Sequence, residues 1–137
     1  MNGKIQFGGD GSWVAVGQQQ QMLLAQSPDF DLPTRVYFAA LGRMDRKGHA
    51  RFKRGELMRI CSMVDKRTGE VRSARSDSIN RAVKKAVERG VLADDSSNRC
   101  LVVPHIVAQA NNGPYYDCPV HPEVDLTGQR TRPKLAS

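Results

Sequence analysis

The stretch SARSDSINRAVKKAVERGVL, residues 73–92, decides the fold that we expect for this chain. Apolar side chains recur in it at intervals of three and four residues, and Arg, Lys, Ser or Asp fill most other positions. Ser73 or Ser76 can cap its start, and Gly90 stands where a helix C-terminus commonly takes a left-handed residue. The pattern predicts an amphipathic helix over about residues 76–89, with a buried face of Ile79, Ala82, Val83, Ala86 and Val87.

Two further helices are predicted before this one. Asp31 and Pro33 mark the start of the first, because Asp is a good N-cap and Pro is tolerated in the first turn; Gly48 ends it. The second covers about residues 54–64 and has apolar side chains on one stripe. Cys61 falls on that stripe, so we expect it in the core.

The remaining elements are short. Strands are predicted at residues 4–7, 13–16, 49–52 and 99–107, the last interrupted by Pro104. Residues 18–26 are expected as a short helix or a linker, residues 65–73 as a polar connection, and residues 93–98 as a short acidic turn or wing. The central order is therefore helix, short strand, helix, turn, helix, turn and strand.

The net charge is +7, and most of the positive charge lies in one segment. Residues 35–89 hold 16 of the 21 Lys and Arg with 6 of the 14 acids, a balance of +10, and the rest of the chain has a balance of −3. This asymmetry indicates a polyanionic partner for the central segment. A solvated basic face that serves only solubility is the alternative.

The element order resembles the winged helix-turn-helix domains of bacterial and phage regulators and replication proteins. The resemblance covers about residues 32–104 and depends on FKRGELMRIC, SDSINRAVKKAVERGVL and the segment ending in RCLVVP. The chain is also similar to small helix-turn-helix proteins of actinobacteria and their phages, in which CLVVP precedes a C-x-x-H turn. The resemblance implies an α+β fold, a winged helix-turn-helix of three helices with a small antiparallel sheet, followed by an irregular C-terminal tail.

We expect this domain over residues 31–110, after an N-terminal segment 1–30 and before a tail 111–137. In such domains the third helix enters the major groove of DNA, with its N-terminal residues nearest the base edges. The resemblance implies base contacts by Arg75, Ser78 and Arg81. Backbone contacts are expected from Arg72, Lys84 and Lys85. The alternative is an amphipathic helix whose cations simply face solvent.

Four residues near the C-terminus have the side chains of a zinc site. Cys100, His105, Cys118 and His121 are spaced C-x4-H-x12-C-x2-H, and two thiolates with two imidazoles can complete a tetrahedral zinc site. Such an ion would be structural and would tie the tail 111–137 to residues 100–105. Alternatively, Cys100 is a small buried residue and the histidines lie at the surface. His49 is assigned no role.

Other functional classes are less well supported. The chain has no Gly-rich phosphate loop, G-x-S-x-G elbow or HExxH motif, so an enzyme is not expected. With three cysteines, no apolar run of about 20 residues and no secretion signal, a reducing, cytoplasmic location without membrane insertion is expected. We expect double-stranded DNA binding in transcriptional regulation, with homodimerisation as an option. The alternatives are a plasmid or phage replication factor, and a host-interaction protein that binds the transcription machinery through its basic face.

Overall fold

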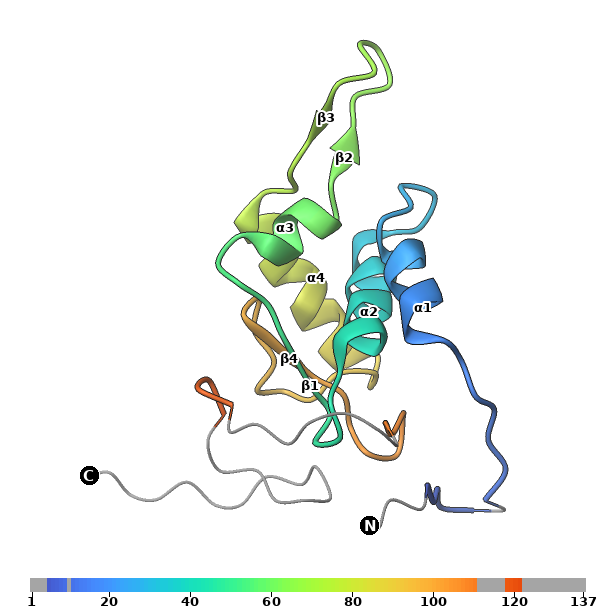
Figure 1. Cartoon of the computed structure of the whole chain (residues 1–137). Helices are drawn as coiled ribbons and strands as arrows, with labels where there is room; N and C mark the ends of the chain where they lie inside the picture. Colours follow the sequence, from blue (N-terminus) through green and yellow to red (C-terminus); the bar gives the residue numbers. More distant parts are fainter. Residues whose placement is uncertain (1–4, 10, 111–117, 122–137) are drawn as a thin grey trace, which may run out of the picture.

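The computed structural model describes residues 5–9, 11–110 and 118–121. Its elements in chain order are α1 (Gln18–Ala25), α2 (Leu32–Arg43), β1 (His49–Arg51), α3 (Glu56–Ile60), β2 (Met63–Val64), β3 (Val71–Arg72), α4 (Ser76–Glu88) and β4 (Cys100–Val102) (Figure 1). The strands form two antiparallel pairs, β1 with β4 and β2 with β3. The chain is therefore an α+β protein, as the sequence predicts at this level.

Helix α2 begins where the sequence predicts. The Asp31 carboxylate accepts a hydrogen bond from the backbone N–H of Thr34 (3.0 Å), which caps the helix, and Pro33 lies in the first turn. Helix α1 packs against α2 so closely that a side chain at Gly42 would come within 2.9 Å of the backbone nitrogen of Met22. Residues 18–25 are therefore a helix that packs against α2 through Gln21 and Ala25, not a linker.

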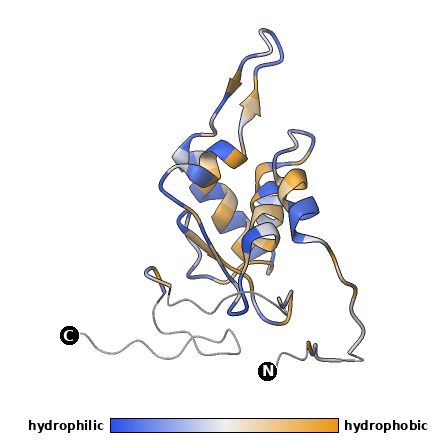
Figure 2. Ribbon diagram, in the orientation of Figure 1, coloured by the Kyte–Doolittle hydropathy of each residue, from blue (hydrophilic) through white to orange (hydrophobic). Residues whose placement is uncertain are grey.

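Helix α4 is amphipathic, as predicted. Ile79, Ala82, Val83 and Ala86 are buried, and they pack with Val36, Ala39 and Ala40 of α2 in the main core. Hydrophobic and hydrophilic residues alternate along these helices (Figure 2). Gly90 has a φ of +81°, the left-handed conformation expected after a helix. The start differs from the prediction, because Arg75 occupies the N-cap position in place of Ser73 or Ser76.

The β1–β4 pair separates two groups of buried side chains. His49 lies opposite Val102, Ala50 opposite Leu101, and Arg51 opposite Cys100. Since side chains alternate between the two faces of a strand pair, Ala50 and Leu101 share one face and join the main core. Cys100 and Val102 share the other face, where they pack with Cys118 and Ala93 in a second, small cluster. His49 belongs to this second face.

The segment between α3 and α4 was predicted wrongly. Helix α3 ends at Ile60, earlier than the expected residue 64, although Cys61 is fully buried as predicted. Residues 63–72 are not a plain connection: they form a β-hairpin of β2 and β3, which projects away from the helices (Figure 1). Its turn contains Gly69 with a φ of +75°, a conformation that favours glycine.

Three other predictions of strand structure are corrected. The described residues 5–9 and 11–16 form no strand. Residues 94–98 form turns, as predicted, with an isolated antiparallel bridge between Ser97 and Cys100. Strand β4 ends at Val102, because the chain turns at Pro104, whose nitrogen cannot donate a ladder hydrogen bond. Among the described residues no helix has the length and apolar character to cross a membrane.

Candidate metal centre and basic helix face

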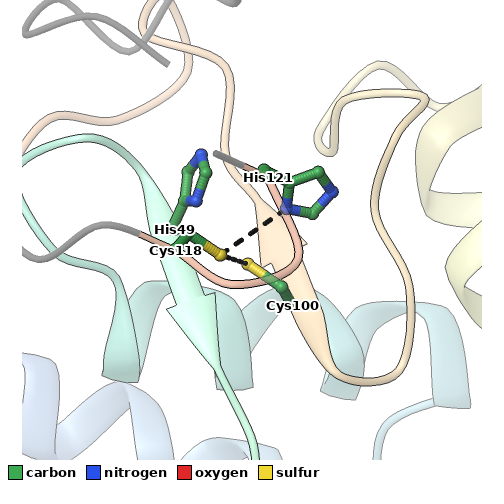
Figure 3. A group of neighbouring side chains, drawn as sticks. All are labelled: His49, Cys100, Cys118 and His121. Atoms are coloured by element: carbon green, nitrogen blue, oxygen red, sulfur yellow. Dashed lines mark hydrogen bonds between the residues drawn. The ribbon is translucent and has the colours of Figure 1, made fainter. Parts of the chain in front are cut away.

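Four buried side chains with metal-binding atoms meet beside the β1–β4 pair. They belong to His49, Cys100, Cys118 and His121, and their ligand atoms all lie within 4.8 Å of one another (Figure 3). Two sulfurs and two imidazole nitrogens form the donor set that zinc binds in structural sites. This cluster could hold a metal ion.

Two turns and one strand pairing place these four residues. The carboxylate of Asp45 accepts hydrogen bonds from the backbone N–H groups of Lys47 (2.9 Å) and His49 (3.1 Å), which fixes the turn that leads into β1. Strand pairing then brings His49 of β1 to the same face as Cys100 of β4. The turn 118–121 supplies the other two ligands, and Cys118 and His121 are 2% and 5% exposed.

Two distances within the cluster are close to those of a tetrahedral site. The Sγ atoms of Cys118 and Cys100 are 3.5 Å apart, and Cys118 Sγ lies 3.8 Å from His121 Nδ1. Zinc bond lengths place two ligand atoms of a tetrahedron roughly 3.3–3.8 Å apart. An ion at the centre would therefore require only small movements of these two sulfurs and this nitrogen.

A second interaction fixes the orientation of His121. Its Nε2 atom is hydrogen-bonded to the backbone oxygen of Asp95, and the Asp95 carboxylate lies 3.5 Å from the same nitrogen. A carbonyl oxygen can only accept, so Nε2 carries the proton and Nδ1 faces the sulfur of Cys118. Histidine ligands of metals are commonly oriented in this way, by a hydrogen bond from the nitrogen that does not bind the ion.

His49 is the member of the cluster whose ring nitrogens lack hydrogen bonds within the part of the chain that the structure describes. It is 1% exposed, and neither ring nitrogen has a hydrogen-bond partner among the described residues. Burial, and then the neighbouring His121, lowers the pKa of His49 to about 4, so the ring is neutral and has a lone pair for an ion. The rings of His49 and His121 meet edge to face, with centroids 5.1 Å apart. A bound ion would satisfy one of the unpaired nitrogens.

The buried thiol of Cys100 is difficult to ionise in the absence of a cation. Burial, and then the adjacent Cys118, raises the pKa of Cys100 well above the ordinary thiol value. Two neighbouring thiolates are therefore unfavourable in the absence of a cation. A divalent ion reverses this balance, since metal binding deprotonates thiol ligands.

The predicted ligand His105 lies outside the cluster, and His49 takes its place. His105 is half-buried in the turn 105–107, and its backbone oxygen accepts a hydrogen bond from the side chain of Gln109 (3.1 Å). The reason is that β4 ends at Val102 and Pro104 turns the chain, so His105 does not continue the strand that carries Cys100. His49 was missed because its position depends on pairing with β4, about fifty residues away.

The predicted DNA-binding residues lie on and beside the outer face of α4. Ser78 is half-buried, and the others are exposed: Arg72, Arg75, Arg81, Lys84 and Lys85. Three of the cations contact acids of the same helix at distances of 3.4–3.6 Å, namely Arg75 and Arg81 with Asp77, and Lys85 with Glu88. Exposed pairs of this kind contribute little to stability, so the cations can exchange these partners for others.

A groove runs beside this face. It has a volume of about 690 Å³ and lies between α4, with Asn80, Arg81 and Lys84, and the loop 94–97. The loop is tied to the helix by a hydrogen bond from the side-chain amide of Asn98 to that of Asn80 (3.0 Å). The loop that carries Asp95, the partner of His121, is therefore also the loop that borders the basic helix.

Comparison with protein-family models, with curated proteins and with solved structures finds no match for this chain. Its class is defined by the fold and the sites alone. It is an α+β protein with a buried cluster of two cysteines and two histidines beside a strand pair, and with a basic face on its longest helix.

Proposed function

We propose that the chain binds double-stranded DNA, with α4 in the major groove. The observation that carries this proposal is the division of α4 into two faces, one buried against α2 and the other exposed and rich in Arg and Lys. A helix presented in this way on a compact support is what helix-turn-helix proteins insert into DNA. The +10 charge of residues 35–89 supports the same partner.

The order of elements supports a winged helix-turn-helix arrangement. Helices α2, α3 and α4 would correspond to its three helices, and β1 and β4 to its small sheet. Arg75, Ser78 and Arg81 lie toward the N-terminal part of α4, where they would approach base edges. Arg72, Lys84 and Lys85 would hold phosphates.

Fluorescence anisotropy with a labelled duplex, measured across a salt series, tests the proposal. We expect affinity to fall steeply with salt, and Lys84→Ala to reduce the slope of log K against log salt by about one, the change expected for one lost phosphate contact. Lys47→Ala is the matched control: it removes one positive charge from the turn between α2 and β1, and its slope should equal that of the wild type.

Absence of binding by the wild-type protein at low salt contradicts the proposal and favours a protein partner for the basic face. If DNA is bound, selection of preferred sites separates the biological roles. Sites at promoters favour transcriptional regulation, and clustered repeats at an origin favour replication. Paired half-sites would indicate a homodimer, because two-fold symmetry in a protein is mirrored in its operator.

We also propose that the ion of the buried cluster is zinc with a structural role. The Cys₂His₂ donor set supports zinc, and four protein ligands leave no position for a catalytic water. Purified protein should contain one zinc per chain by elemental analysis, and Co²⁺ exchanged into the site should give the visible bands of tetrahedral thiolate coordination. Metal-free protein after purification without chelators contradicts this proposal. A reducing, cytoplasmic compartment would keep the ligand thiols available.

A further inference from the structure

The β2–β3 hairpin is exposed and projects beside the N-terminal end of α4 (Figure 1). Each of its strands has only two residues, and an isolated hairpin of this size is not stable in water. The rest of the protein must therefore hold it in place. The exposure of Val64 and Val71, 43% and 63%, shows that the hairpin contributes little to the core.

A buried arginine anchors the first strand. Arg35 of α2 is 1% exposed, and its guanidinium donates to the backbone oxygens of Ala25 (2.9 Å) and Ser62 (3.0 Å). The same group lies 3.8 Å from the sulfur of Met63, the first residue of β2. On the other side, Ala74 N–H donates to the Met58 oxygen (3.0 Å) immediately before α4. Both ends of the hairpin are thus fixed to the helices.

The tip of the hairpin is ordered by its own hydrogen bonds. The carboxylate of Asp65 accepts from the backbone N–H groups of Arg67 (2.8 Å) and Thr68 (3.3 Å), so this acidic group is directed into the turn. The side chains of Lys66 and Arg67 are exposed at the tip. A defined turn that presents two adjacent cations is suited to phosphate oxygens, which require positioned donors.

We propose that this hairpin is a second DNA-binding element, in which Lys66 and Arg67 hold phosphates of the duplex that α4 enters. This inference rests on the proposed function of α4. Charge continuity supports it, because exposed Arg72 and Arg75 connect the hairpin to the basic face of the helix. The hairpin adds contacts along the duplex beyond those of α4. The sequence had predicted only a polar connection for these residues.

Two variants, compared with the wild type on one labelled duplex, test the inference. The variant Lys66→Ala/Arg67→Ala should reduce the salt slope by about two and remove one flanking patch of the hydroxyl-radical footprint. The patch over α4 should remain. Glu70→Gln removes a negative charge from the same hairpin and should raise affinity, a change of opposite sign that loss of folding would not produce. Thermal melting checks that each variant folds, since these side chains are exposed.

The outcomes separate this inference from the proposed function. If Lys84→Ala weakens binding while Lys66→Ala/Arg67→Ala and Glu70→Gln leave slope and footprint unchanged, the hairpin inference is overturned and the function of α4 stands. In that case the exposed Val64 and Val71 become the candidate surface for a protein partner. If the wild-type protein binds no duplex, both proposals fail together.

Discussion

The cluster of two cysteines and two histidines depends on His49, a residue whose importance is invisible in the local sequence. The spacing of Cys118 and His121, with two residues between them, is a local signal and was correctly read as a possible ligand pair. Cys100 was also predicted. The fourth ligand could not be identified from spacing, because the register between β1 and β4 decides which side chains share a face.

Replacement of His49 should therefore lower metal affinity, whereas replacement of His105 should leave it unchanged. His49→Ala should lower metal affinity by a factor of at least about ten, since it removes one of four ligands. His105→Ala is the matched control and should retain wild-type affinity, because His105 lies in the turn after Pro104. Titration with a competing chromophoric chelator measures both affinities. Equal losses in the two variants would contradict the assignment of His49.

At the level of single elements, helices were predictable where their signals are local. The N-cap of α2 at Asp31, the glycine after α4 and the apolar stripe of α4 each lie within a few residues of the structure that they specify. The β2–β3 hairpin was missed for the opposite reason. Two-residue strands show no periodicity, and the contact that fixes β2 comes from Arg35, 28 residues before Met63.

The cap of α2 gives a stability prediction with a defined pH dependence. Hydrogen bonds from Thr34 hold the pKa of Asp31 below its ordinary value, with Arg89 contributing less. Asp31→Ala should lower the free energy of unfolding by about 1 kcal/mol at neutral pH, because it leaves a backbone N–H of the first turn unpaired.

Asp31→Asn separates the charge from the cap. Since the folded-state pKa is lowered, the charged carboxylate stabilises the protein above its unfolded-state pKa, and this contribution is lost as the pH falls through the folded-state value. The wild type should therefore exceed Asp31→Asn in stability at neutral pH, and the difference should disappear in acid. Urea unfolding at several pH values measures this difference. A difference independent of pH would show that the charge of Asp31 has no role.

In the whole molecule, the metal cluster and the basic helix are connected through one loop. His121 contacts the backbone of Asp95, and Asn98 of the same loop is hydrogen-bonded to Asn80 on the exposed side of α4. The loop also borders the groove beside Arg81 and Lys84. An ion that fixes His121 would therefore fix the border of the proposed DNA-binding face.

Removal of the ion should consequently affect both stability and DNA binding. A ligand present at about 1,000 times its dissociation constant stabilises the folded state by roughly 4 kcal/mol, so chelation should lower the melting temperature measurably. Amide hydrogens of residues 94–98 should exchange faster in the chelated protein, because His121 is then no longer fixed and holds the backbone of Asp95 less firmly.

The affinity for DNA should also fall on chelation and recover when zinc is restored. His105→Ala should respond to chelation as the wild type does, whereas His49→Ala should reach the metal-free behaviour at a lower chelator concentration. Unchanged exchange at residues 94–98 with full DNA affinity after chelation would mean that the cluster and the helix act independently.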